Sequence, residues 1–131
     1  MTGVMDLSEL CRQMTPRLAD GVYVYCSFGD FRLPAGLAPL CTFRETEGLT
    51  VILGKNEAEA AALPYVFPCR LITLAVHSSL DAVGFLARIT DRLAQAGIAC
   101  NAVAAFHHDH LFVPEARAEE TLQILRNLAS E

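Results

Sequence analysis

Apolar residues follow two different periods along the second half of the chain. Residues 69–76 (CRLITLAV) form an almost continuous apolar run, which is typical of a strand in the middle of a sheet. A helical period follows from residue 78, with apolar residues three and four positions apart, at Ala82, Phe85, Leu86, Ile89, Leu93 and Ala96. Gly97 ends that helix. Strands are predicted next at 98–106 and 111–114, and an amphipathic helix at 115–130.

The first half predicts a helix, three strands and a second helix. Apolar residues at helical spacing lie in residues 5–14, and Thr15-Pro16 is predicted to end that helix. The remaining elements are predicted at residues 22–28, 40–45 and 49–54 (strands) and 55–63 (helix). Pro64 and Pro68 then mark the best internal boundary of the chain.

The order of these elements predicts the fold class. The second half reads strand, helix, strand, strand, helix, which is a ferredoxin-like arrangement without its last strand, and the first half resembles a shifted copy. We therefore expect an α+β protein of two ferredoxin-like (βαββαβ) units, with antiparallel sheets and helices on one face, that share or exchange a strand. The expected domains are residues 1–66 and 67–131.

Composition excludes several functional classes. The 131 residues are 53% hydrophobic and 19% charged, with a net charge of -5, so a globular core is expected. The basic residues are scattered, which argues against nucleic-acid binding. No apolar stretch is long enough to span a membrane, and the first residues do not resemble a signal peptide. The five cysteines are widely spaced without a CxxC pair, so we expect buried free thiols in a reducing, cytoplasmic setting.

The junction VHSSLDAVGF, residues 76–85, has the richest polar chemistry. Ser78 with Asp81 fits a capping box, and Ser79 is the alternative cap if the helix begins one residue later. In either case free backbone N–H groups would face the loop and suit a small anion or carboxylate. Gly84 would leave room for close packing or for a ligand that approaches the backbone.

A second polar stretch, AFHHDHLFVP at residues 105–114, holds three histidines and an aspartate. Strand alternation would place His108 with His110 on one face and His107 with Asp109 on the other. Two ligands on each face are fewer than a zinc site requires, and no nucleophile motif is present, so no metal and no catalytic residues are expected. A polar turn is the favoured interpretation. A pH-sensitive element and a metal-dependent enzyme built on His107–His110 remain alternatives.

These stretches carry a resemblance to a known family. VHSSLDAVGFLARITDRLAQAGIACNAVAAF resembles the core of an ACT domain, with Gly84 on the family's loop glycine and Ala96-Gly97-Ile98 on its second signature. The whole chain resembles the short bacterial tandem-ACT proteins, most closely at residues 39–53, 67–84 and 108–114. Many ACT domains have proline before the loop glycine, where this sequence has Val83.

The resemblance implies a site for an amino acid or a similar small effector. We therefore expect a regulatory protein without catalytic activity or a cofactor, and the exposed sheet edges and helix faces of such units predict a homodimer. The implied ligand-binding residues are Ser78, Ser79, Leu80, Asp81, Ala82, Val83 and Gly84 on the loop, with Asn101 and Val103 on the facing strand. Backbone N–H groups would hold a carboxylate, and Asp81 or Asn101 an ammonium group. A protein-interaction module without a ligand is the first alternative.

Overall fold

The structure is a computed structural model, and it describes residues 6–131. The chain divides into two compact units, which we describe separately. The discontinuous unit consists of the residues up to Asp20 together with Arg70–Glu131, and the continuous unit is Gly21–Cys69. One strand, β5 (Val66–Ala75), contributes its first residues to the continuous unit and the rest to the discontinuous unit.

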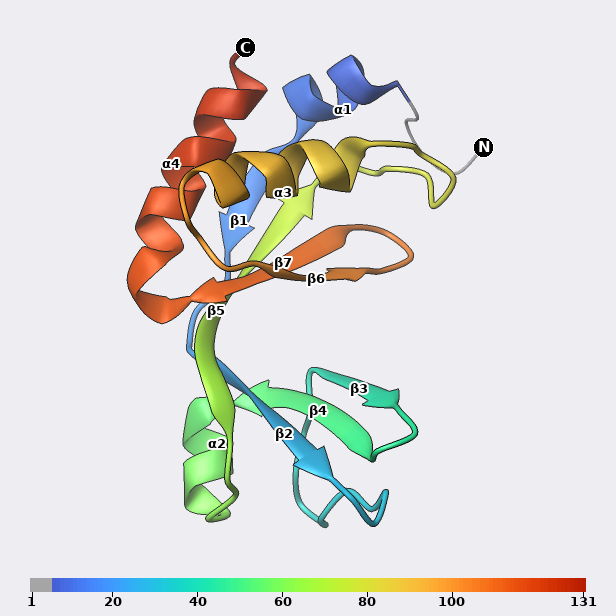
Figure 1. Ribbon diagram of the computed structural model, residues 1–131, viewed down its shortest axis with the longest axis vertical. Helices are drawn as coiled ribbons and strands as arrows, with labels where there is room; N and C mark the ends of the chain where they lie inside the picture. Colours follow the sequence, from blue (N-terminus) through green and yellow to red (C-terminus); the bar gives the residue numbers. More distant parts are fainter. Residues whose placement is uncertain (1–5) are drawn as a thin grey trace. The chain divides into compact units, whose positions relative to one another are not determined.

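The discontinuous unit is a four-stranded antiparallel sheet with helices on one face. Its strands lie in the order β1 (Thr15–Leu18), β5, β7 (Asp109–Pro114) and β6 (Asn101–Ala104). The helices on that face are α1 (Leu7–Gln13), α3 (Phe85–Gln95) and α4 (Ala118–Ala129), the last preceded by the 3₁₀ turn η1 (Glu115–Arg117) (Figure 1). The helices and the two central strands bury a common apolar core, which includes Leu10, Ile72, Leu74, Phe85, Ile89, Leu93, Leu111, Val113, Leu122 and Leu125.

Strand β1 completes this sheet from the opposite end of the chain. Residues 70–131 supply a strand, a helix, two strands and a helix, and β1 pairs antiparallel with β5 as the missing fourth strand. The pairing runs from Thr15 opposite Ala75 to Leu18 opposite Ile72, and Arg70 Nη2 donates a hydrogen bond to the Ala19 carbonyl (3.0 Å). The strand exchange that the sequence predicted is therefore confirmed.

The continuous unit repeats the same sheet order with a shorter set of helices. Its strands lie in the order β3 (Cys41–Arg44), β4 (Leu49–Gly54), β2 (Tyr23–Phe28) and the first residues of β5. Helix α2 (Lys55–Ala60) follows β4, while an irregular segment over residues 29–40 replaces the first helix of a ferredoxin-like unit. The buried core is small and consists of Val24, Cys26, Leu49, Val51, Leu53 and Ala58.

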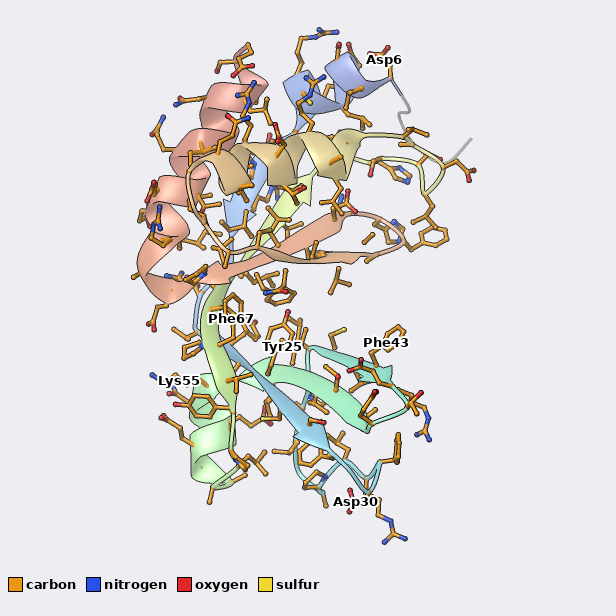
Figure 2. The ribbon with its side chains drawn as sticks, in the orientation of Figure 1. Asp6, Tyr25, Asp30, Phe43, Lys55 and Phe67 are labelled. Carbon is orange, nitrogen blue, oxygen red and sulfur yellow. The ribbon has the colours of Figure 1, made fainter. Side chains whose placement is uncertain are left out.

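The prolines that mark boundaries in the sequence both lie inside strands. Helix α1 ends at Gln13, which confirms the predicted end before Thr15-Pro16, but Pro16 itself lies within β1, where its partner is Leu74. Pro68 lies inside β5 and not outside it, because the pairing of β2 with β5 is irregular there. Phe67 has a φ of 59° and its ring meets Tyr25 edge-on, with centroids 5.9 Å apart (Figure 2). Proline has no N–H to donate, so it is tolerated in such an irregularity.

The two compact units do not follow the chain in sequence order. The expected boundary at residue 66 lies close to the join between Cys69 and Arg70. The residues up to Asp20, however, pack with the C-terminal part, because β1 needs β5 as its hydrogen-bonding partner. Helix α1 accompanies β1 and buries Leu10 and Cys11 in the same core.

Candidate functional site

The loop between β5 and α3 is organised by serine turns and not by a helix cap. The backbone N–H of Ser78 donates to the Val76 carbonyl (2.9 Å), and that of Ala82 donates to the Ser79 carbonyl (3.0 Å). Ser79 Oγ accepts a hydrogen bond from the backbone N–H of Asp81 (3.1 Å). The predicted capping box at Ser78 and the alternative cap at Ser79 are both wrong, since the hydroxyl of Ser79 stabilises a turn several residues before the helix.

Helix α3 begins at Phe85, with Gly84 as its N-cap. Gly84 has a φ of 91°, in the left-handed region that glycine adopts without steric cost. A Cβ at this position would meet only Leu7 Cδ2, at an ordinary contact distance of 3.6 Å. The positive φ is therefore sufficient to explain the glycine, and close packing against it is not the reason.

The start of α3 has no side-chain cap. The first helical hydrogen bond runs from the N–H of Arg88 to the carbonyl of Gly84 (2.9 Å), and within residues 6–131 no side chain caps the first turn. The N–H groups of Phe85, Leu86 and Ala87 are thus left without an intrahelical acceptor. Such groups, together with the helix dipole, favour a negatively charged partner.

A small hollow of about 220 Å³, which we call the loop hollow, lies at this helix start. It is lined by Ser78, Ser79, Leu80, Ala82, Gly84, Phe85, Leu86, Ala87, Ala104, Ala105 and Asp109. The volume is below the range of about 300–1,000 Å³ that is common for drug-sized ligands. The hollow is therefore of a size for a small metabolite.

The loop hollow brings together five of the nine residues that the resemblance implied. These are Ser78, Ser79, Leu80, Ala82 and Gly84. The other four, Asp81, Val83, Asn101 and Val103, are not among the lining residues. Asn101 and Val103 lie on β6, with Phe112 and His110 as their partners on β7, while the strands contribute Ala104 and Asp109 to the hollow instead.

Asp109 is the lining residue that the sequence interpretation missed. It is the first residue of β7 and the Cα partner of Ala104. Burial raises the pKa of its carboxyl above the ordinary value, although the neighbouring His110 and His108 partly oppose that shift. Within residues 6–131 its carboxylate has no hydrogen bond or ion pair. Strand alternation could have identified it, because Asp109 lies between His108 and His110 in the sequence and its side chain therefore points to the other face of the strand.

The chain's four histidines form a continuous series of ring contacts around the β6–β7 turn. Ring centroids are 6.0 Å apart for His77 and His107, and 6.4 Å apart both for His107 and His108 and for His108 and His110. His108 Nδ1 lies 3.2 Å from the Val76 carbonyl oxygen, so it donates there. The N–H of Ala105 donates to the carbonyl of His108 (3.0 Å) and closes the turn. The histidines thus connect the hairpin to β5 and the residues that follow it.

Metal binding and reactive thiols are the other chemistry that the residue types allow. In residues 6–131 no group of three or more His, Cys, Asp or Glu side chains is arranged to hold a metal ion. All five cysteines are free, and burial raises the pKa of the Cys69 thiol to about 12 and that of Cys100 to about 11. No helix in the described part of the chain is long and apolar enough to cross a membrane.

Comparison with known protein families identifies the class of protein. One ACT-domain family model matches residues 2–70 and a second matches residues 66–127. The chain belongs to the ACT-domain family and carries two such domains in tandem. No curated protein matches the sequence.

Solved structures agree with this assignment. A protein of unknown function from Vibrio cholerae, described as a possible transport protein, is 40% identical with a TM-score of 0.84, over 94% of this chain and 95% of that one. A protein from Agrobacterium tumefaciens is 19% identical with a TM-score of 0.75, over 88% and 89% of the two chains. The regulatory subunit of aspartate kinase from Thermus flavus is 9% identical with a TM-score of 0.66, over 98% and 99%.

The more distant of these likenesses concern the fold alone, and they confirm the ferredoxin-like, ACT-type architecture predicted from the sequence. The two ACT-domain matches also support a small-molecule-binding regulatory role.

Proposed function

We propose that this protein is a non-catalytic regulator whose effector is an amino acid bound in the loop hollow. The observation that carries the proposal is the uncapped start of α3, where the N–H groups of Phe85, Leu86 and Ala87 lack an intrahelical acceptor beside a hollow of metabolite size. A carboxylate supplies the acceptor that these donors lack. Small, mainly apolar side chains surround the rest of the space, as is usual for a pocket with few orienting polar groups.

Regulation requires that the effector binds one state of the protein more tightly than another. The loop hollow is formed by two separate segments, the residues 78–87 and the β6–β7 hairpin. A ligand that contacts both segments favours the arrangement in which they lie together. In this proposal the effector therefore shifts the population of loop arrangements and, through it, the surface offered to a second molecule.

Isothermal titration against the twenty amino acids tests the proposal. We expect at least one amino acid to bind, and no binding at millimolar concentration would refute the amino-acid hypothesis. Ala104→Phe should fill the hollow and weaken binding by more than about tenfold. Ala102→Phe is the matched control, because Ala102 is an exposed alanine on the same strand that does not line the hollow.

A homodimer in a reducing, cytoplasmic setting is part of the same proposal. Strand β6 is the last strand of its sheet order, and an outer strand with free backbone groups is commonly covered by another chain. The free cysteines agree with a reducing compartment. Light scattering coupled to size-exclusion chromatography measures the mass directly, and a monomer across the micromolar range would remove the dimer from the proposal.

A protein-interaction module is the second candidate function. Three large apolar side chains near the loop hollow are exposed: Leu80 (65%), Val83 (84%) and Phe106 (64%). Exposed apolar side chains that lie together commonly mark contact surfaces. Val83→Asp should abolish an interaction through this surface without changing amino-acid affinity, because Val83 does not line the hollow. Loss of amino-acid binding in that variant would instead connect the exposed surface to the ligand site.

A further inference from the structure

The carboxyl group of Asp109 is part of the lining of the loop hollow. Asp109 begins β7 and is paired with Ala104, so its side chain lines the hollow from the hairpin. The loop residues 78–84 and the first turn of α3 line the hollow from the other segment. The carboxylate and the uncapped helix start thus belong to the same small space but to different elements.

No ion pair among the described residues compensates the charge of Asp109. Among residues 6–131, the three ion pairs are Arg12–Glu9, Arg92–Glu131 and Arg117–Glu120, and none involves Asp109. The neighbouring His110 and His108 only partly oppose the effect of burial on the pKa of this carboxyl. A half-buried carboxylate without a partner is costly, so it is more common at functional sites than elsewhere.

The other lining residues limit the size and chemistry of a ligand that fits the loop hollow. Four alanines and a glycine account for much of the wall: Ala82, Ala87, Ala104, Ala105 and Gly84. They offer no side-chain hydrogen bonds, and they leave a space of about 220 Å³. A compact molecule with both a carboxylate and a cationic group can bind the N–H groups at the helix start and the carboxylate of Asp109 at the same time.

We propose that Asp109 binds the ammonium group of the ligand and makes the loop hollow selective for small α-amino acids over equally small acids that lack the amine. This inference rests on the proposed function, because it assumes that the effector occupies the loop hollow. The inference names Asp109, on the β6–β7 hairpin, as the residue that distinguishes an amino acid from a hydroxy acid. Neither Asp81 nor Asn101, which the resemblance suggested for the ammonium group, lines the hollow.

Titrations with matched ligands test the selectivity on the unmodified protein. Glycine, L-alanine and L-serine are the probes, and glycolate and L-lactate replace the amine of the first two by a hydroxyl. We expect the amino acids to bind at least about tenfold more tightly than their hydroxy-acid counterparts, as expected for a charge-assisted hydrogen bond. Equal affinity for L-alanine and L-lactate would overturn the assignment.

Variants locate the effect at Asp109. Asp109→Asn should weaken binding of the tightest of the three amino acids by at least about tenfold and leave the affinity for its hydroxy acid unchanged or improved. Asp81→Asn is the matched control, since Asp81 is an exposed aspartate on the neighbouring loop outside the hollow lining, and it should bind as the unmodified protein does. Retained affinity in Asp109→Asn would contradict the inference.

The failure of this inference is distinguishable from failure of the proposed function. If none of the twenty amino acids binds the unmodified protein, the proposed function itself is wrong. If an amino acid binds but Asp109→Asn binds it equally well, the ligand site stands and only the role of Asp109 is wrong. If only large amino acids bind, the selection for small ligands is wrong. The comparison of L-alanine with L-lactate needs no variant, so the inference stays testable even if Asp109→Asn does not fold.

Discussion

Thr73 and His110 share a hydrogen bond across the two central strands of the discontinuous unit, with Thr73 Oγ1 and His110 Nδ1 2.9 Å apart. Both side chains are half-buried, and the contact joins β5 to β7 in addition to their pairing in the sheet order. Thr73→Val should lower the free energy of unfolding by about 1 kcal/mol, because the imidazole nitrogen loses its partner. Urea unfolding of the variant measures this loss, and unchanged stability would show that water replaces the hydroxyl.

The burial of His110 predicts a dependence of stability on pH. Burial, with a smaller contribution from His108, lowers the pKa of His110 below the ordinary value of 6.5. The unfolded chain therefore binds more protons than the folded chain just below that value, and stability falls as the pH decreases from about 6.5 toward the folded pKa. Urea unfolding between pH 7.5 and 5.5 should show this decline, and His110→Gln should reduce its slope. An identical slope in the variant would assign the decline to other groups.

Asp109→Asn should increase the stability of the ligand-free protein at pH 7. Burial raises the pKa of Asp109 above 3.8, so the folded chain holds its proton more tightly than the unfolded chain does. Stability is therefore lost as the pH rises through the folded pKa, and the ionised carboxylate has a net cost at neutral pH. Thermal unfolding should show a higher midpoint for the variant at pH 7 and a smaller difference near pH 4. A lower midpoint at pH 7 would mean that Asp109 has a stabilising partner.

Gly84→Ala tests the conformational reason for the glycine at the start of α3. Since φ is 91° there, an L-residue should lower the free energy of unfolding by about 1–2 kcal/mol, although its Cβ has space. Gly54→Ala is the matched control, because Gly54 also precedes a helix but has a φ of -61°, and an added Cβ would meet nothing within 4 Å. That control should be neutral or slightly stabilising. Equal effects of the two substitutions would contradict the strain argument.

Leu10→Ala tests whether helix α1 is part of the core of the discontinuous unit. Leu10 is fully buried among residues of α3, α4 and β5. The substitution should cost about 2–5 kcal/mol through lost burial and the cavity left behind. Leu40→Ala, at a site that is 47% exposed, should cost less than about 0.5 kcal/mol. Hydrogen exchange should show reduced protection of the α4 amides in Leu10→Ala. Unaltered protection of α4 would mean that α1 does not stabilise this core.

Local patterns were sufficient for most elements of the fold. Alternation and apolar runs located β2, β4 and the central part of β5, and helical spacing located α1 and α4. Strand β1 was missed because its four residues contain a proline and form a strand only through pairing with β5, more than fifty positions further along the chain. A pairing of that kind is not visible in a local window.

The site was predicted less completely than the fold. The loop residues Ser78 to Gly84 were singled out, but the start of α3 was placed too early, because Ser78, Ser79 and Asp81 imitate a cap that the backbone does not use. Asp109 was grouped with the histidines around it, although alternation along β7 turns its side chain the other way. Its role depends on the hollow that two distant segments form, and sequence spacing does not describe such a space.

The pairing of β1 with β5 also determines the order in which this protein is completed during synthesis. The continuous unit, Gly21–Cys69, is one uninterrupted stretch, so all of its residues are synthesised before β7 and α4. Helix α1 and β1 emerge before that unit, yet their core is finished only when α4 is available. The earliest of these segments is therefore among the last to reach its final environment, because its core needs residues of α4.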